Sequence, residues 1–479
     1  MRERMKSLKR SLMALMVPRT LSFLEESNYQ RKMDEKVAKK LDRLKKITLG
    51  KDLGVFGSTS LKNLPFTTYE AYKKYYEYPR EQHFLYKLND YLMAHTSGTM
   101  AQPKKFLLPK TALMDNLRKT ALASLFIVSH DGERVTFEMG DTMYSNIPGG
   151  SQLAALMTEI GMKNRIAFVK NCPDPKLPFQ AKVDYFVNNY KNIDMAYMTV
   201  TTLLDQIYSR IGEPFHLKGF MTQDSSSIVF KDEIKKITGS YPKTTYGATE
   251  IMIPTVASIE HPGCFIFDWR VLYAEFVPHD QKIGNGEPII EADVDVLDLS
   301  EVEPGRRYQL IATPYLTEMT RYVMPDILQC VDRGDDVLNS QLPVFKYHAR
   351  SDKIIMLHNF TRIVEEEITQ ILKDVNVPFV DYTVIKERDG THEYMKMYLE
   401  LLKPMDHDTV YRMIDEKLTE FDRDWHDLKE FLKYYPLRLE LIPKGSFRHY
   451  LQHREGMTRV ERVQMKQKRL DLLLSLKGT

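Results

Sequence analysis

The sequence predicts an α/β protein with a large N-terminal domain and a small α+β C-terminal domain. Two observations support this prediction. Between about residues 90 and 330, short β-branched or aromatic runs alternate with amphipathic stretches, as they do in proteins with mixed sheets and helices. The chain also has 479 residues, which is more than one compact domain usually holds. We place the domain boundary between residues 345 and 346, so that the domains span 1–345 and 346–479.

Residues 1–60 read as a basic, helical leader. The first eighteen residues are interrupted by charges and lack a small-residue cleavage site, so a surface-covering amphipathic helix is favoured over a signal peptide or a membrane-surface role. Residues 33–47 have apolar side chains at helical spacing, and Thr68 precedes an acidic and aromatic run, as a helix cap would. No stretch reaches the roughly 18 to 20 apolar residues that span a bilayer.

The remaining elements follow from local patterns. In the first domain we expect helices at 151–162 and 226–239, and strands at 165–170, 195–200, 218–223, 272–278 and 308–316. In the second domain we expect a helix at 361–375, strands at 381–388 and 393–402, a long charged helix, and a strand within 437–447. This small set of strands and helices makes a lid-like α+β domain.

Composition narrows the class of partner. The formal charge is only +3, because 68 Lys and Arg nearly balance 65 Asp and Glu, so no basic field indicates nucleic acid. A small-molecule substrate is expected instead. Three cysteines lie far apart, which indicates neither a disulfide framework nor a zinc site. A reducing, cytoplasmic compartment fits best.

The segment HTSGTMAQPKKFLLPK, residues 95–110, is the first candidate site. Its hydroxyls and backbone amides suit a phosphate, Gly98 lets the main chain approach closely, and Lys104 or Lys105 supplies charge. Clusters of Ser, Thr and Gly also form plain turns, so this segment alone leaves both interpretations open.

Two further segments offer complementary chemistry. In TTYGATEIM, the ring of Tyr246 could stack on a planar base, and Gly247 allows a tight turn. The Glu250 carboxylate could hold a Mg²⁺ ion near a triphosphate. In TRYVMPDI, Asp326 follows an apolar run, where a carboxylate can accept both hydroxyls of a ribose. The alternative for the first segment is a strand end with a solvated Glu250, and the alternative for the second is a structural role for Asp326.

The segment HARSDKII lies at the proposed boundary. Arg350 there can reach a nucleotide, and Asp352 can serve as a hinge.

The order of these segments resembles the adenylate-forming superfamily of acyl-CoA synthetases, luciferases and nonribosomal adenylation domains. The resemblance runs from about residue 60 to the C-terminus and rests on TSGT, YGATE, TRYVMPD and RSDK. It implies a large N-terminal domain of mixed sheets and helices that holds ATP and an acid. It also implies a small, mobile C-terminal domain that rotates between adenylation and transfer.

Two branches of the superfamily compete. Three segments are similar to segments of the acyl acid amido synthetases of the Gretchen Hagen three family. They are PKGSFRHYLQHREG, RVQMKQKR and the expected strand VLYAEFVP. The segment LKNLPFTTYEAYKKYYEYP looks like phenylacetate-CoA-ligase-like enzymes, and the Arg350–Asp352 hinge resembles the CoA-ligase pattern. The balance favours an amido synthetase.

The resemblance also implies roles for individual residues. It puts Thr96, Ser97, Gly98 and Thr99 on the triphosphate, with Lys104 or Lys105 assisting. It places Tyr246 against adenine, with Gly247 in the same nucleotide-binding segment, and Thr249 near the α-phosphate and the acyl carboxylate. It places Glu250 on Mg²⁺, Asp326 on the ribose and Arg350 beside it. Thr222 and Gln223 stand where a glycine pair usually walls the adenine. Lys466 matches the catalytic lysine that touches the α-phosphate, with Lys468 as its rival and a solvated helix end as the alternative.

The chain departs from the family pattern at two places. Met100 and Ala101 replace a glycine-bearing part of the first loop, and Pro325 replaces the glycine before the ribose Asp. We therefore expect an ATP- and Mg²⁺-dependent ligase that activates a small carboxylic acid and transfers it to an amine. The alternatives are a CoA ligase and a catalytically silenced, nucleotide-binding relative.

Overall fold

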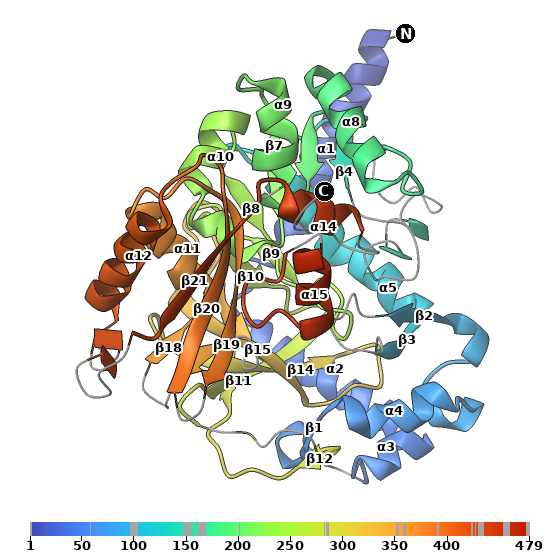
Figure 1. The fold of residues 1–479 in the computed structure, drawn as a ribbon. Coiled ribbons are helices and arrows are strands. Elements are labelled where there is room, and N and C mark those ends of the chain that lie inside the picture. The colour runs from blue at the N-terminus through green and yellow to red at the C-terminus, as the bar shows by residue number, and fades with distance from the viewer. Residues whose placement is uncertain are drawn as a thin grey trace. The chain divides into compact units, whose positions relative to one another are not determined.

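The computed structural model contains two compact units (Figure 1). Unit 1 comprises residues 1–198 and 213–347, and unit 2 comprises residues 199–212 and 348–479. The described residues are 2–57, 59–95, 104–146, 153, 156, 157, 159, 160, 169–200, 202–281, 283, 287–350, 354–357, 361–389, 392–422, 425, 426, 428, 429, 435–453 and 460–475.

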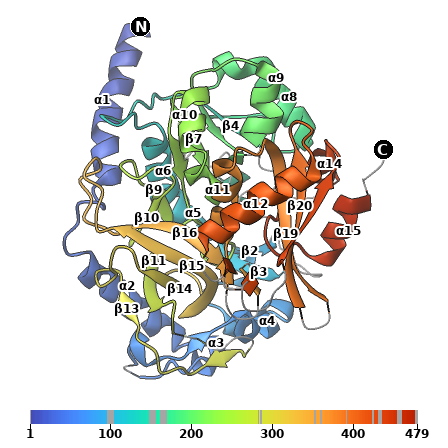
Figure 2. The same ribbon diagram turned by 60° about the vertical axis from the view of Figure 1, so that its left-hand side comes forward.

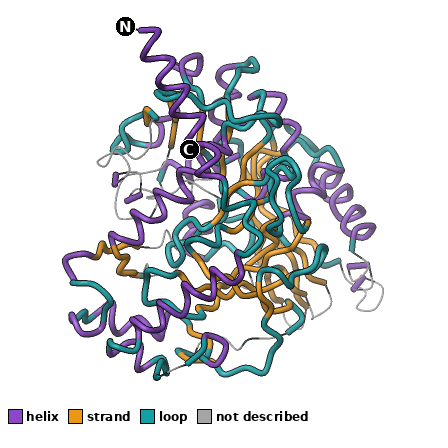
Figure 3. The backbone as a smooth tube through the Cα atoms, turned by 180° about the vertical axis from the view of Figure 1, so that it is seen from behind, coloured by secondary structure: helices purple, strands orange, loops and turns teal. Residues whose placement is uncertain are grey.

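Unit 1 begins with helices. They are α1 (Arg2–Leu21), α2 (Tyr29–Leu44), α3 (Thr48–Asp52) and α4 (Tyr69–Glu77), with short 3-10 turns at Leu61–Asn63, Glu81–His83 and Leu88–Asp90. Helix α1 starts at the end marked N in Figure 3. Its Met13 packs in a small apolar cluster with Phe126 and Phe137, as expected of a helix that covers part of the surface. None of the helices in the described ranges is long and apolar enough to cross a membrane.

Helix α2 is fastened to the body of unit 1 through Lys40. Met33, Val37 and Leu41 form its buried face, as the helical spacing predicts. The Lys40 ammonium donates to the backbone carbonyls of Pro314 at 2.7 Å and Thr317 at 2.9 Å, and also to that of Met319. Three carbonyls of one turn are thereby satisfied by a single buried cation.

A five-stranded parallel sheet forms one layer of unit 1. Its order is β5-β4-β6-β7-β8. The strands are β4 (Thr142–Ser145), β5 (Lys170–Cys172), β6 (Met195–Tyr197), β7 (Gly219–Thr222) and β8 (Pro242–Thr244), and the helical segments between and before them are α5 (Lys110–Asn116), Leu117–Ala121, α6 (Leu122–Val128), α8 (Phe179–Asn189), Tyr190–Asn192, Ser225–Ile228 and α10 (Lys231–Thr238). The chain reaches the carboxyl ends of β7 and β8 at Thr222 and Thr244, where parallel α/β sheets usually place their sites.

A nine-stranded mixed sheet forms the second layer of unit 1, with the order β13-β11-β14-β15-β16-β10-β9. Off this path, β1 pairs with β15, and β12 pairs with β1. Its strands are β1 (Phe66–Thr67), β9 (Thr255–Ala257), β10 (Phe265–Phe267), β11 (Leu272–Pro278), β12 (Ile289–Ile290), β13 (Leu297–Asp298), β14 (Arg307–Pro314), β15 (Tyr322–Asp332) and β16 (Val344–Arg350). The strands predicted at 272–278 and 308–316 are confirmed as β11 and β14. A separate hairpin joins β2 (Tyr91–His95) to β3 (Lys105–Pro109).

Unit 2 is built on a three-stranded sheet, β19-β20-β21. Its elements are β17 (Ile355–Leu357), β18 (Thr361–Ile363), α11 (Glu365–Asp374), β19 (Phe379–Asp389), β20 (His392–Leu401), α12 (His407–Phe421), β21 (Leu437–Ile442), α14 (Ser446–Gln452) and α15 (Gln467–Ser475), together with Thr202–Tyr208 and α9 (Ser209–Ile211) from the inserted segment. Helices α11 and α12 share one apolar cluster with the sheet, and Figure 2 shows α12 in the foreground. Helices α14 and α15 share a second cluster with Tyr398.

Three predicted elements need correction. The helix expected at 361–375 begins only at Glu365, because Thr361–Ile363 pairs with Ile355–Leu357 as β18. The helix expected at 226–239 is split into a 3-10 turn and α10 (Lys231–Thr238), which ends at Gly239 in a left-handed conformation with φ 76°. The strand expected at 195–200 ends at Tyr197. Most of the helix expected at 151–162 lies outside the described residues.

Candidate functional site

The turn that follows β8 carries four of the predicted site residues, Tyr246, Gly247, Thr249 and Glu250. Gly247 is required there, because a Cβ atom at this position would lie 2.6 Å from the carbonyl oxygen of Met252. The amide of Ala248 donates to that same carbonyl at 3.0 Å, and Met252 has φ 63°, so the chain reverses tightly. The reversal places Thr249 and Glu250 at its tip, with Thr249 partly exposed and Glu250 buried.

Tyr246 and Asp326 meet although 80 positions separate them. The Tyr246 hydroxyl donates to Asp326 Oδ2 at 2.7 Å, and both side chains are buried. Tyr246 stacks on Phe265 of β10 with ring centroids 5.4 Å apart and planes 18° from parallel. Burial first, and then the Asp326 charge, raises the pKa of the Tyr246 phenol, so this hydroxyl stays a donor at neutral pH.

The backbone of Tyr246 is held by Thr255, the first residue of β9. The Tyr246 amide donates to Thr255 Oγ1 at 2.7 Å, and Thr255 Oγ1 donates in turn to the Tyr246 carbonyl at 2.8 Å. Neither Thr255 nor Phe265 is part of a chemically suggestive pattern, so the sequence motifs do not point to them. The aromatic run Phe265–Phe267 was the one available signal for a ring against Tyr246.

Glu250 lies in an electrostatically linked group of tyrosines. It is 9% exposed, and its charge contributes, after burial, to raising the pKa of Tyr76, Tyr246 and Tyr322. Groups of three or more His, Cys, Asp or Glu side chains suited to a metal are absent among the residues described. A single carboxylate nevertheless fits Mg²⁺, which is commonly bound by one or two carboxylates together with substrate phosphates.

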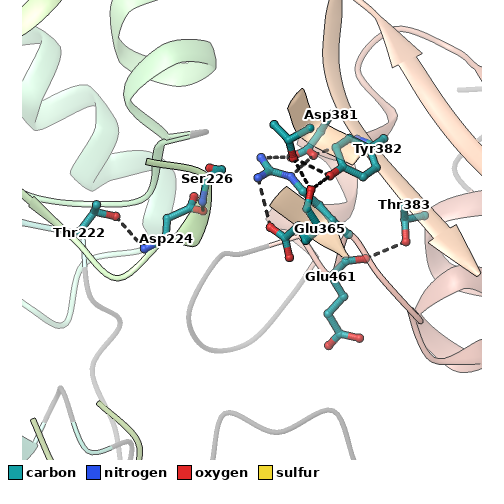
Figure 4. Close-up of polar contacts among 10 residues, drawn as sticks. Thr222, Asp224, Ser226, Glu365, Asp381, Tyr382, Thr383 and Glu461 are labelled. Carbon is teal, nitrogen blue, oxygen red and sulfur yellow. Dashed lines mark hydrogen bonds and ion pairs between the residues drawn. The ribbon is translucent and has the colours of Figure 1, made fainter. Parts of the chain in front are cut away.

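The segment after β7 forms a compact polar turn. The Asp224 amide donates to Thr222 Oγ1 at 3.0 Å, and Asp224 Oδ1 accepts from the amide of Ser226 at 3.0 Å and from its hydroxyl at 2.8 Å (Figure 4). The Thr222 carbonyl also accepts from the Thr245 amide at 3.1 Å, which ties this turn to the Tyr246 segment. Gln223, between Thr222 and Asp224, is partly exposed.

The first predicted loop is described only at its two ends. Thr96, Ser97, Gly98 and Thr99 lie outside the described residues. At the far end, the Lys104 ammonium lies over the Tyr69 ring, 4.9 Å from its centroid. The Tyr69 hydroxyl accepts from the Lys105 amide at 3.1 Å and lies 3.3 Å from the Lys105 carbonyl, so Tyr69 anchors the end of the loop. Tyr69 was not among the predicted site residues.

The predicted residues near and beyond the domain boundary are described unevenly. Arg350 is the last residue of β16, its side chain is not described, and Asp352 lies outside the described residues. In unit 2, Lys466 is partly exposed and immediately precedes α15, and its carbonyl accepts from the amides of Arg469 and Leu470, both at 2.9 Å. Lys468 lies on the exposed side of that helix.

Comparisons with known proteins agree with this architecture. The model of the GH3 family central domain matches residues 265–350. A GH3.15 acyl acid amido synthetase is 11% identical with a TM-score of 0.68, covering 95% of this chain and 96% of that chain. A 2-hydroxyisobutyryl-CoA ligase, in the postadenylation state in complex with 2-HIB-AMP, is 13% identical with a TM-score of 0.59, covering 96% and 92%. Comparison with curated protein sequences gives no match.

The family model covers the strands from β10 to β16, including β10, which holds Phe265, and β15, which holds Asp326. The structural matches extend over nearly the whole chain. The predicted mixture of sheets and helices is confirmed, and the family match and the structural matches agree with the resemblance stated from the motifs. The chain therefore has the fold of these amido synthetase and CoA ligase structures, and its residues 265–350 match the GH3 family central domain.

Proposed function

We propose that this protein is an ATP-dependent ligase that activates a carboxylic acid as an acyl adenylate and transfers the acyl group to an amine. The observation that carries this proposal is the buried Tyr246–Asp326 pair beside Glu250, in a chain with a GH3 central domain. A structural neighbour that covers 95% of the chain is an acyl acid amido synthetase, which favours an amide as the product.

In the first half-reaction, a carboxylate oxygen of the acid attacks the α-phosphorus of ATP. The bond from that phosphorus to the bridging oxygen breaks, and pyrophosphate leaves with the electron pair. Negative charge builds on the phosphate oxygens, so fixed cations and donors lower the barrier. We assign Thr96, Ser97, Gly98, Thr99 and Lys104 to the triphosphate, and Thr249 and Lys466 to the α-phosphate.

The nucleoside is held by the residues of unit 1. Asp326 accepts the ribose hydroxyls, and Arg350 assists it. We place adenine at Tyr246, whose ring is held in position by Phe265, with Gly247, Thr222 and Gln223 at its edges. Glu250 would hold Mg²⁺, which when bound neutralises the charge of the phosphates.

In the second half-reaction, an amine nitrogen attacks the acyl carbonyl carbon and AMP leaves, which forms the amide. The test is exchange of labelled pyrophosphate into ATP with pooled carboxylic acids, followed by mass spectrometry with pooled amines or CoA as acceptors. Acid-dependent exchange with an amide product supports the proposal. Absence of exchange with every acid contradicts it and favours a silenced, nucleotide-binding relative.

A CoA ligase is the second candidate, because a CoA ligase shares the fold over 96% of this chain. It shares the first half-reaction and differs in the acceptor. Formation of an acyl-CoA thioester with no amide from any amine would establish it in place of the amido synthetase. We also propose a cytoplasmic location, which the three free cysteines support.

A further inference from the structure

We infer that Arg462 is a positioning residue for Lys466: it anchors residues 460–466 against β19 and so fixes the place from which Lys466 acts. The inference rests on the proposed function only in giving Lys466 its chemical role. The anchoring itself stands on contacts within unit 2.

The backbone of this segment is paired with β19. Val463 forms a parallel bridge with Val384, the Val384 amide donates to the Arg462 carbonyl at 2.8 Å, and the Gln464 amide donates to the Val384 carbonyl at 2.8 Å. The Thr383 hydroxyl donates to the Glu461 carbonyl at 2.7 Å, and Figure 4 shows this contact. The segment therefore behaves as a short added strand that ends just before Lys466.

The Arg462 side chain adds a charged anchor to this pairing. Its Nε donates to Asp381 Oδ1 at 2.7 Å, and its Nη1 donates to Glu365 Oε1 at 3.4 Å. Arg462 is 5% exposed and Asp381 is fully buried. A guanidinium can bridge two carboxylates on different elements, so Arg462 links the segment to α11 and to β19 at once.

The two carboxylates are themselves held in place. Asp381 Oδ1 also accepts from the Tyr382 amide at 2.8 Å, and the Tyr382 hydroxyl donates to the Glu365 carbonyl at 2.9 Å (Figure 4). The Arg462 guanidinium lies over the Tyr382 ring, 5.7 Å from its centroid. The socket that receives Arg462 is thus built from rigid elements rather than from long, exposed side chains.

The segment then turns sharply toward Lys466. Gln464 has φ 53°, and its Oε1 accepts from the Lys386 amide at 3.2 Å, so the turn is also tied to β19. Met465 packs in the apolar cluster of α14 and α15, and the Lys466 carbonyl accepts from the first turn of α15. Only four positions separate the Arg462 anchor from Lys466, so loss of the anchor displaces the lysine more than it disturbs ATP binding in unit 1.

The experiment compares three variants with the wild type. Arg462→Met removes the anchor. Arg462→Lys keeps a positive charge beside Asp381 but cannot bridge both carboxylates. Because the buried carboxylate keeps a charged partner, this variant should fold even if Arg462→Met does not. Lys429→Met is the matched control, because it breaks a different ion pair of unit 2, Lys429 with Asp415 at 2.7 Å, without touching residues 460–466.

In pyrophosphate exchange, we expect Arg462→Met to lower kcat by about tenfold to a hundredfold, the range expected for a misplaced catalytic group. ATP affinity should change by less than about twofold, and Arg462→Lys should be intermediate. Lys429→Met should keep kcat within about twofold of the wild-type value, although its melting temperature falls by about as much as that of Arg462→Met. An unchanged kcat in folded Arg462→Met, or an equal loss in Lys429→Met, overturns the inference.

Hydrogen exchange separates this inference from the proposed function. In Arg462→Met, amide exchange of peptides covering 460–470 should be faster than in the wild type, above all at Gln464. If the wild type shows no pyrophosphate exchange, the proposed function fails, and hydrogen exchange alone decides whether Arg462 anchors the segment. Unchanged protection of these peptides overturns the anchoring.

Discussion

The Tyr246 hydroxyl donates to Asp326 Oδ2 at 2.7 Å, so the residue expected at adenine orients the residue expected at the ribose. Tyr246→Phe keeps the ring on Phe265 and removes only the donor. Loss of one buried bond to a carboxylate costs about 1 to 3 kcal/mol, so the ATP KM in pyrophosphate exchange should rise by about fivefold or more. Tyr308→Phe is the control, because its hydroxyl accepts from the Glu303 amide at 2.9 Å. An equal change of KM in both variants would contradict a role for Tyr246 in nucleotide binding.

Gly247→Ala should reduce pyrophosphate exchange sharply. The added Cβ would lie 2.6 Å from the Met252 carbonyl, so the turn that carries Glu250 has to shift. A displaced group in a reacting site costs about a hundredfold in rate. Gly305→Ala provides the control, because its φ is 85° and no atom lies within 4 Å of the added methyl. It should cost about 1 to 2 kcal/mol of stability with no change in exchange.

Arg321→Met should destabilise unit 1. The Arg321 guanidinium pairs with buried Glu275 at 3.2 Å and donates to the Leu64 carbonyl at 2.5 Å. Above pH 7, where Glu275 is mainly charged, removing one partner of this buried pair costs about 3 to 5 kcal/mol, because the other charge is left uncompensated. The double variant Arg321→Met with Glu275→Leu should regain much of that loss in denaturant unfolding. If the double variant is as unstable as the single one, the buried charge is not the cause.

The stability of the wild type should decline with pH through the titration of Glu275. Burial raises the pKa of this carboxyl from 4.5 to about 7. Between these values the folded protein keeps a proton that the unfolded chain has lost, so the free energy of unfolding falls as pH rises. Glu275→Gln does not titrate. Its stability relative to the wild type should therefore increase across this window and level off above it, and a constant difference would refute the assignment.

Lys466→Ala should abolish acid-dependent pyrophosphate exchange and leave ATP binding intact, because the proposed role of Lys466 begins only as charge develops at the α-phosphate. Lys468→Ala, two positions further on the exposed side of α15, should retain exchange. Isothermal titration with ATP checks binding in both variants. Full exchange in Lys466→Ala together with loss in Lys468→Ala would transfer the role to Lys468.

The sequence predicted the elements whose local pattern agrees with their environment. The strands at 272–278 and 308–316 were found because their apolar runs are long and end in turn residues. The start of α11 was wrong because Thr361–Ile363 is recruited into a pairing with Ile355–Leu357, a contact that helical spacing does not reveal. The local sequence pattern is sufficient to predict an element that buries one of its own faces. It is insufficient where pairing with another segment determines the secondary structure.

The candidate site shows the same division. Tyr246, Glu250 and Asp326 stand in motifs, and their chemistry can be read from the sequence. The sequence does not reveal the residues whose role is to position another residue, because such roles depend on contacts between distant parts of the chain. These residues are Thr255, Phe265, Tyr69 and Arg462.

Through the Lys40 ammonium, the N-terminal helices also stabilise a distant turn of unit 1. It satisfies three carbonyls of the turn at Pro314–Met319, which leads directly into the strand that carries Asp326. Helix α2 is thus an integral part of unit 1 rather than a removable leader. A truncation that starts the protein after residue 60 would strip that turn of its cation, and substitutions at position 40 would be tolerated only with compensating changes in the turn.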